Sequence, residues 1–166
     1  AQGIAAAGQP TDQVWIADGV YDESLSVASG MELYGGFEGL SGAQETSLAE
    51  RDWKRNYTIV RPSTGRGLEI SGSGDVTVDS IAFVDAEADS GDDGAGVYFN
   101  MFDGAATLAR SVISGNAADG GTGGGGVAID GGSGDITLVE TIVIDNAAIG
   151  GGALRGSGAA DGAGLL

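Results

Sequence analysis

The sequence predicts an all-β fold: a right-handed, single-stranded parallel β-helix (a solenoid) of about five coils with a short N-terminal capping helix. Three observations predict it, namely a 30-residue internal repeat, an alternation of apolar and polar residues within each copy, and 33 glycines among 166 residues. Alternation with period two is typical of strands, and glycine-rich links disfavour long helices. We therefore expect a single domain over residues 1–166, in which each repeat forms one coil stacked on the previous coil.

The first part of the chain is less regular than the rest. We expect residues 1–13 to form the cap, with a helix-compatible stretch at residues 2–8, and residues 14–74 to form the N-terminal coils. Short alternating runs predict strands at residues 14–17, 25–27, 31–34, 57–60 and 67–70. Residues 38–55 are an excursion from this pattern, and its Trp53 is expected to fold back on the wall of the solenoid rather than to bind a sugar.

Residues 75–166 carry the 30-residue repeats, which begin at Asp75, Ala105 and Asp135. Each copy has two alternating runs, a glycine-rich link and a third run, so that three short strands recur at the same spacing. Alternation predicts that three columns of aliphatic and aromatic side chains point inward. These columns are Val76, Ala106 and Ile136; Val78, Leu108 and Leu138; and Phe83, Ile113 and Val143.

Polar residues mark the bends between the predicted strands. Ser80, Arg110 and Glu140 share one bend, where a polar side chain can stay in contact with water. Asn116 and Asn146 share the following turn, and we interpret them as a structural ladder that binds neighbouring backbones.

An outward apolar column predicts an interface. Ala82, Val112 and Ile142 alternate with the inward column, and Ile144 lies near them. The chain stops at Leu165 and Leu166 without an obvious capping helix. Two interpretations stay open: a fragment truncated at Leu166, which is favoured, or an edge that another molecule covers, as in end-to-end stacking into a filament.

The composition excludes several classes of protein and site. With 2 Pro, no Cys and no His, collagen, a disulfide scaffold, Cys-based or imidazole metal sites and a Ser-His-Asp triad are ruled out. The formal net charge is −17, with 7 Lys+Arg against 24 Asp+Glu, which argues against a nucleic-acid partner. No apolar run approaches the length of about 18 residues that a membrane span needs. Such an acidic chain suits a secreted protein.

Several segments resemble a known group of proteins. The segments VWIADGVYDESLSV, MELYGGFEG and ETSLAERDWKRNYTIV resemble the opening coils of bacterial secreted right-handed parallel β-helix proteins of the pectate-lyase-like superfamily. The later copies are similar to the repeats of polymorphic outer-membrane proteins, which pair a GGA-[ILV] tetrapeptide with F-x-x-N. Here GGAL stands at residues 151–154, and ISGN and VIDN carry an aliphatic residue where that family has Phe. The resemblance implies the fold and an extracellular or cell-surface location, and it covers adhesins, passengers, stalks and carbohydrate enzymes alike.

One acidic loop is a candidate calcium site. Asp89, Asp92 and Asp93 lie close together beside Gly91 and Gly94, and carboxylates on flexible backbone are hard oxygen ligands. A solvated acidic loop is the favoured alternative, and calcium is the only cofactor that the sequence suggests. A second stretch, GGSGD at residues 131–135, is similar to a calcium nonapeptide but has its Asp one residue early.

The sequence therefore favours an extracellular or cell-surface structural or adhesive module without catalytic activity, which stands alone or is a subunit of a surface assembly or filament. Self-association, other surface proteins and carbohydrate are the partners considered. The alternative is a carbohydrate-binding or polysaccharide-degrading, lyase-like domain, for which Arg66, Arg110 and Arg155 can line one wall. Clustered acids beside an Arg would favour that alternative, and the sequence assigns no catalytic residue. A single column of three threonines is too short for an ice-binding face.

Overall fold

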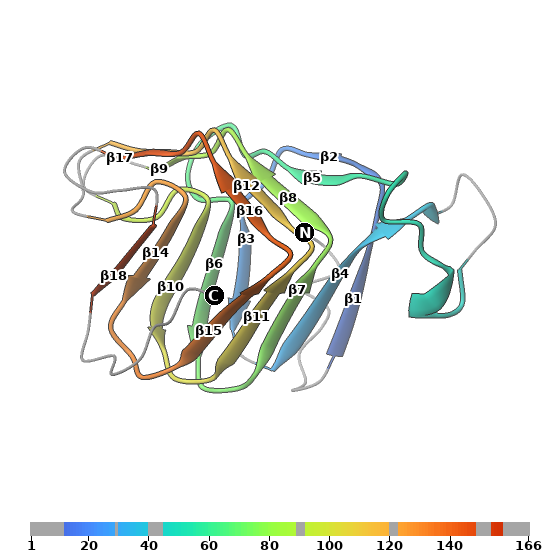
Figure 1. Ribbon diagram of the computed structural model, residues 1–166, viewed down its shortest axis with the longest axis horizontal. Coiled ribbons are helices and arrows are strands. Elements are labelled where there is room, and N and C mark those ends of the chain that lie inside the picture. The colour runs from blue at the N-terminus through green and yellow to red at the C-terminus, as the bar shows by residue number, and fades with distance from the viewer. Residues whose placement is uncertain are drawn as a thin grey trace.

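The computed structural model describes residues 12–28, 30–39, 45–88, 92–119, 123–148 and the backbone of 154–157. This part of the chain is all-β with parallel sheets, an arrangement consistent with a parallel β-helix. Figure 1 shows the strands of each sheet lying side by side along the length of the molecule. In the described ranges the one helical element is a short 3-10 turn, η2 (Leu48–Glu50).

Two five-stranded sheets form facing walls, and the chain passes through them in turn. Sheet A has the order β1 (Asp12–Ala17), β4 (Met31–Phe37), β7 (Val76–Asp79), β11 (Ala105–Ala109) and β15 (Asp135–Val139). Sheet C has the order β3 (Leu25–Ala28), β6 (Leu68–Gly72), β10 (Val97–Phe102), β14 (Val127–Asp130) and β18 (Leu154–Ser157).

Two further sheets connect these walls. Sheet B contains β2 (Gly19–Tyr21), β5 (Thr58–Val60), β8 (Ile81–Val84), β12 (Val112–Ser114) and β16 (Ile142–Ile144). The small sheet D contains β9 (Glu87–Ala88), β13 (Ala117–Ala118) and β17 (Ala147–Ala148). Because neighbours within each sheet are separated by a whole passage of the chain, every sheet is built from parallel strands.

The strand register follows the sequence repeat. Val78 pairs with Leu108, and Leu108 pairs with Leu138, each 30 residues further along the chain. The front of the chain keeps the same sheets with unequal spacing. Asp12 pairs with Met31, whereas Glu32 pairs with Thr77, because the excursion is inserted after β4.

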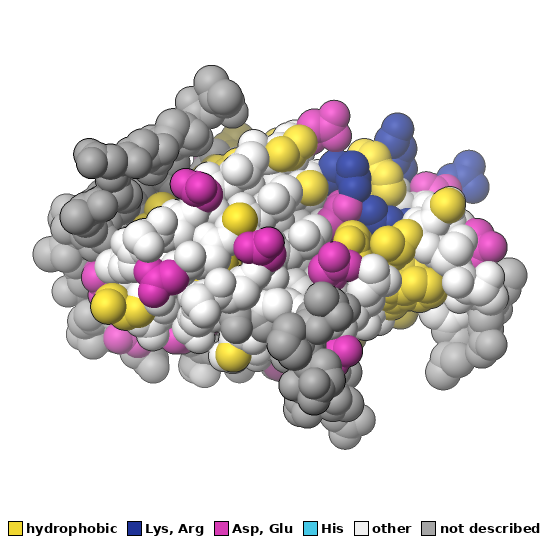
Figure 2. Space-filling model, turned by 90° about the horizontal axis from the view of Figure 1, so that it is seen from below, with side chains coloured by type: hydrophobic (Ala, Val, Ile, Leu, Met, Phe, Trp, Pro, Cys, Tyr) yellow, Lys and Arg dark blue, Asp and Glu magenta, His cyan; other side chains and the backbone are white. Residues whose placement is uncertain are grey.

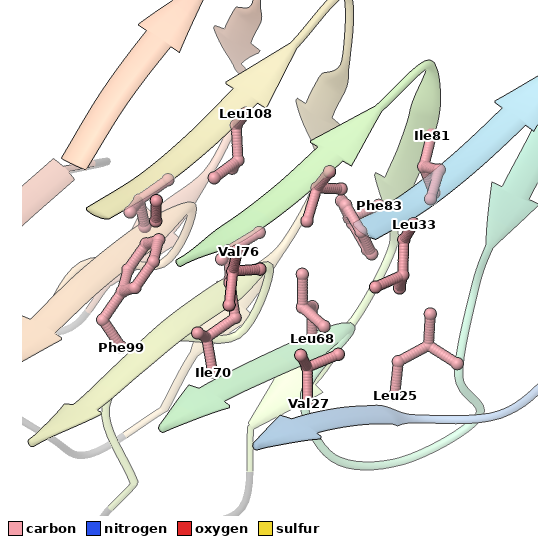
Figure 3. Close-up of a cluster of buried hydrophobic side chains, with 14 of the residues drawn as sticks. Leu25, Val27, Leu33, Leu68, Ile70, Val76, Ile81, Phe83, Phe99 and Leu108 are labelled. Carbon is pink, nitrogen blue, oxygen red and sulfur yellow. The ribbon is translucent and has the colours of Figure 1, made fainter. Parts of the chain in front are cut away.

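The core lies between the sheets and is filled by the predicted inward columns (Figure 3). Val78 and Leu108 have no exposed surface, while Leu138 is partly buried and packs on the same cluster. Phe99 and Phe102 lie side by side in the core, with ring centroids 5.8 Å apart. Burial of each such side chain contributes about 1.5–3 kcal/mol, so the stacked columns are the main source of stability. The inward orientation of these columns is thus confirmed.

The chain turns at two corners with left-handed backbone at matched positions. The first corner, between sheets A and B, has Ser80, Arg110 and Glu140 at φ of 61°, 48° and 51°. The second corner, after sheet B, has Asp85, Gly115 and Asp145 at φ of 53°, 68° and 55°. The prediction that the polar residue of the first corner stays in water is wrong for Ser80, which is buried and donates to Asp79 Oδ1 at 2.7 Å.

The predicted asparagine ladder lies just after the second corner. Asn116 is fully buried, and its Oδ1 accepts the Ala86 N–H at 3.0 Å while its Nδ2 donates to the Phe83 carbonyl at 3.1 Å. Asn146 Oδ1 accepts from Asn116 Nδ2 at 2.8 Å, and Asn146 Nδ2 donates to the Ile113 carbonyl at 2.8 Å. The side-chain amides therefore join successive passages of the chain, and the ladder is confirmed.

Some predictions fall outside the described residues. These include the capping helix at residues 2–8, the GGA of GGAL, Asp89, Leu165 and Leu166. Residues 12 and 13, predicted as part of the cap, belong to β1. Within the described ranges no helix has the length and apolar character needed to cross a membrane.

Candidate functional site

The excursion between β4 and β5 carries a group of cations around an indole ring. We call Arg51, Trp53, Lys54, Arg55 and Arg110 the basic–aromatic cluster; four come from the excursion, and Arg110 comes from the first corner. Glu50 closes the turn before them, since its Oε2 accepts the Thr46 N–H at 2.6 Å.

The excursion packs on β4 at a glycine. Gly36 has φ +91°, and a Cβ there would lie 2.7 Å from Trp53 Cα and Cβ. Only the missing side chain allows this approach, and the left-handed φ favours glycine too. Trp53 therefore lies against the wall of the molecule, as predicted from the sequence.

Asp79 is the anchor of the basic–aromatic cluster. Its carboxylate accepts Arg51 Nη2 at 2.7 Å and Arg110 Nε at 3.0 Å, and it also contacts Arg110 Nη2. The side chains of Asp79 and Arg51 are only 5% and 8% exposed. Burial alone would raise the pKa of Asp79, but hydrogen bonds from Arg51, Ser80 and Arg110 outweigh it and hold the pKa below its ordinary value. The carboxylate is therefore ionised at neutral pH and fixes both guanidinium groups.

Two aromatic rings lie against these cations. Arg51 Cζ is 5.1 Å from the centroid of the Tyr34 ring. Arg110 Cζ and Lys54 Nζ are 5.8 Å and 5.1 Å from the centroid of the Trp53 ring. The Trp53 ring therefore packs against two cations of the chain itself.

A short polar row continues onto the outer face of sheet A. Gln13 Nε2 donates to Glu32 Oε2 at 2.6 Å, and the Tyr34 hydroxyl donates to the same oxygen at 3.2 Å. Trp15 stacks on Phe37 with centroids 4.7 Å apart, and 38% of Trp15 is exposed. Burial and the neighbouring Glu32 raise the pKa of Tyr34, so its hydroxyl remains a donor at neutral pH.

A second charged group lies on the outer face of sheet C, around Arg66. Its guanidinium lies 4.1 Å from the centroid of the Tyr98 ring, and its nitrogens are 3.4 Å from Glu69 Oε2 and 3.6 Å from Asp92 Oδ2. The Tyr98 hydroxyl donates to Asp130 Oδ2 at 3.1 Å. Burial and this hydrogen bond raise the pKa of Tyr98 to about 12, so its hydroxyl keeps its proton near neutral pH and stays a hydrogen-bond donor. We call Arg66, Glu69, Asp92 and Tyr98 the Arg66 group.

The candidate calcium residues have other partners in the structure. Asp92 pairs with Arg66, and Asp93 Oδ1 accepts the Gly123 N–H. Asp89 lies outside the described residues. Among the residues that are described, no three His, Cys, Asp or Glu side chains are grouped to hold a metal ion. Calcium at Asp89, Asp92 and Asp93 stays a prediction.

The outward apolar column lies on sheet B. Val112 pairs with Ile142 on the outer face, and Ile142 and Ile144 are 56% and 50% exposed. Through Ala82, the same row continues to Ile59 and to Val20, which is 51% exposed. Five strands thus share one apolar row, of which the sequence repeat had indicated only the last three members.

Comparison of the chain with protein-family models, with curated proteins and with solved structures finds no match. The functional argument therefore depends on the geometry of the chain itself.

Sequence reasoning missed the role of Asp79. It treated Ser80, Arg110 and Glu140 as polar residues at a bend in contact with water, whereas Arg110 binds the buried Asp79. The sequence did contain one sign of this role. Asp79 occupies the same position in its repeat as Ala109 and Val139 in the next two copies, so it is a charged residue at a position that is otherwise apolar. A buried carboxylate needs a cation nearby, and Arg110 directly follows Ala109, the strand partner of Asp79.

Proposed function

We propose that the chain is a structural or adhesive module of the cell exterior, built as a right-handed parallel β-helix of five coils and without catalytic activity. The right hand follows the near-universal rule for parallel crossover connections. The observation that carries the proposal is the set of side-chain bonds between residues about 30 positions apart. Examples are Asn116 to Asn146, Asp75 Oδ1 to the Ala105 N–H, and Asp103 Oδ1 to the Ser133 N–H.

These bonds join each passage of the chain to the next at several corners in addition to the strand ladders. A solenoid cross-linked in this way is stiff, because movement of one coil breaks bonds to both neighbours. The charges support the same proposal, since the most buried ionic group, around Asp79, holds the fold together and its carboxylate is saturated by two guanidinium groups. An acidic surface keeps such a module soluble outside the cell.

Surface labelling tests the location. We expect an antibody against the folded chain to label intact cells of the source organism, and external protease to remove the signal from those cells. Labelling that appears only after the cells are opened would contradict an exterior module.

A carbohydrate-active domain is the second candidate, and the Arg66 group favours it. Arg66 lies beside Glu69 and Asp92 on the outer face of a sheet, which is the grouping of acids and arginine expected from the sequence to favour a lyase-like site. Incubation with polyuronates, with and without calcium, and detection of unsaturated products measures this activity. We expect no products. Turnover that is lost in Arg66→Ala but kept in Arg61→Ala, a change at another exposed arginine, would establish the enzyme and reject the structural module.

A further inference from the structure

The distribution of cations in this acidic chain is uneven. The chain has 7 Lys+Arg against 24 Asp+Glu. Arg51, Lys54 and Arg55 belong to one stretch of the excursion, and Arg110 meets them at the Trp53 ring. Figure 2 shows the Lys and Arg side chains gathered near one end of the visible face, among hydrophobic side chains, while Asp and Glu side chains are spread over the whole of that face, including beside the Lys and Arg side chains.

The basic–aromatic cluster carries more positive than negative charge. Arg51 and Arg110 share the single carboxylate of Asp79, and Arg55 pairs with Asp52 at 3.6 Å. In the ion pairs of the described residues, the four cations of the cluster thus have two carboxylate partners, Asp79 and Asp52. Lys54 enters none of the ion pairs of the described residues, and the neighbouring Arg55 side chain is 85% exposed, so this part of the cluster faces solvent. Asp79 also holds the Arg110 guanidinium in place, and the Arg110 side chain is 31% exposed, so little side-chain entropy is lost when an anion binds to it.

An acidic edge lies at the opposite ends of the sheet A strands. Asp75 precedes β7, Asp103 lies just before β11, and Asp135 begins β15, and all three are exposed. Asp75 and Asp103 accept hydrogen bonds from uncharged donors, the Ala105 N–H and the Ser133 N–H, which leave their negative charge in place. Arg110 lies at the other end of the same strands, about 15 Å away for a strand of five residues. This separation exceeds the Debye length of about 8 Å at physiological ionic strength, so the two regions do not neutralise each other.

We propose that the basic–aromatic cluster of one molecule binds the acidic edge, residues Asp75, Asp103 and Asp135, of a second copy of this chain. The argument for a second copy is charge complementarity: each molecule presents both regions, about one strand length apart on the same sheet. The contact is heterologous, because the two surfaces differ, and repetition of such a contact builds a linear assembly. This inference rests on the proposed structural role and adds the partner and the surface.

The net charge of −17 gives the association an unusual dependence on salt. At about 0.01 M salt the Debye length is about 30 Å, so repulsion between the whole molecules opposes contact. At about 0.1–0.15 M this long-range repulsion is screened, while contacts of a few ångströms keep much of their attraction. At about 1 M the Debye length falls to about 3 Å and the contacts weaken too. Association is therefore expected to be strongest at intermediate salt.

Light scattering across this salt series tests the proposal. We expect the weight-average mass to rise with protein concentration at intermediate salt and to fall toward the monomer at both extremes. Lys54→Glu with Arg55→Glu should abolish the rise, whereas Arg61→Glu, which reverses one exposed charge elsewhere, should leave it. A wild-type chain that stays monomeric at every salt concentration, or equal losses in Arg55→Glu and Arg61→Glu, would overturn the proposal.

A mixing experiment tests the two surfaces separately. Lys54→Glu/Arg55→Glu keeps the acidic edge, and Asp103→Lys/Asp135→Lys keeps the basic–aromatic cluster, so each alone should be monomeric. Together they should form a 1:1 complex that does not grow, because each molecule retains one functional surface. If Asp103→Lys/Asp135→Lys unfolds, as judged by circular dichroism, Asp135→Lys alone replaces it. Absence of the mixed complex, while the wild type associates, would reject this contact. A chain that labels the surface of intact cells but stays monomeric would reject only the contact between the two copies. Turnover of polyuronates would instead reject the structural role on which this inference rests.

Discussion

The two corners of the molecule turn the chain with the same backbone geometry but hold it by different chemistry. At the first corner, Asp79 binds Arg51 and Arg110, and this arrangement occurs once. At the second corner, the neutral amides of Asn116 and Asn146 repeat the same hydrogen bonds at a spacing of 30 residues. An amide carries its own donor and acceptor and can bind an identical amide. A carboxylate cannot bind another carboxylate, so a charged corner needs residues from elsewhere in the chain.

This difference predicts that replacing a side chain by alanine lowers the free energy of unfolding more at the charged corner than at the neutral corner. Asp79→Ala leaves two guanidinium groups without their carboxylate, one of them on a side chain that is 8% exposed. Removal of one partner from a buried ion pair costs about 3–5 kcal/mol, so we expect a loss of that size in the free energy of unfolding. Urea unfolding followed by circular dichroism measures it. A loss below about 1 kcal/mol would mean that the contacts of Asp79 resemble a surface salt bridge.

The neutral corner should respond less strongly. Asn116→Ala leaves the Ala86 N–H and the Phe83 carbonyl without their side-chain partner in a buried site. A buried unsatisfied group costs about 1–3 kcal/mol, and more when it is charged, so at about 1–2 kcal/mol for each of these two neutral groups we expect a loss of about 2–4 kcal/mol. Asn146→Ala is the matched control, and its effect should be smaller because Asn146 is partly exposed. Equal losses in the two variants would contradict the idea that burial sets the strength of the ladder.

The two corners should also differ in their response to acid. The pKa of Asp79 in the folded protein lies below its ordinary value. Burial raises this pKa, but hydrogen bonds from Arg51, Ser80 and Arg110 lower it by more. The stabilisation by Asp79 is therefore fully present above the unfolded pKa of about 3.9 and is lost as the pH falls through the folded pKa.

The difference in unfolding free energy between wild type and Asp79→Asn isolates this effect from the other carboxylates. We expect that difference to be constant from pH 7 to about 5 and to shrink below about pH 4. The difference between wild type and Asn116→Ala should stay constant over the same range. A constant Asp79 difference down to pH 2 would show that the charge of Asp79 has no part in stability.

The smallest expected effect concerns backbone strain at the second corner. Asp145 has φ 55° and is exposed, while the matched Gly115 has φ 68°. Left-handed backbone is strained for a residue with a Cβ, so Asp145→Gly should stabilise the fold by about 0.5–1 kcal/mol. Thermal unfolding detects this change, and Gly115→Ala should shift the melting temperature in the opposite direction. A lower melting temperature for Asp145→Gly would show that its side chain contributes more than the strain costs.

The sequence was sufficient for what repeats and insufficient for what occurs once. Val78, Leu108 and Leu138 share a column because a period of 30 residues and alternation are both visible in the chain. The ladder of Asn116 and Asn146 followed from the same period. The contact of Arg51 with Asp79 joins residues 28 positions apart across an insertion, so no period indicates it.

The candidate sites divide in the same way. The repeat indicated Val112 and Ile142 as outward residues, and pairing with β5 and β2 added Ile59 and Val20 from the irregular part of the chain. The Arg66 group was not foreseen because its members come from two loops and two strands, and the lengths of the loops differ along the chain. Long-range geometry of this kind depends on loop paths, which local propensity does not determine.

The single ionic corner also has a consequence for the order in which the repeats stack. A chain that lost residues 105–134 would place β15 beside β7 with every aliphatic column intact, and Asn146 would occupy the place of Asn116. At the first corner, however, Glu140 would replace Arg110 next to the buried Asp79, and two carboxylates would meet. Copies that are interchangeable in the core and in the amide ladder are thus distinguished by one charge, which penalises the misfolded form in which residues 105–134 are skipped.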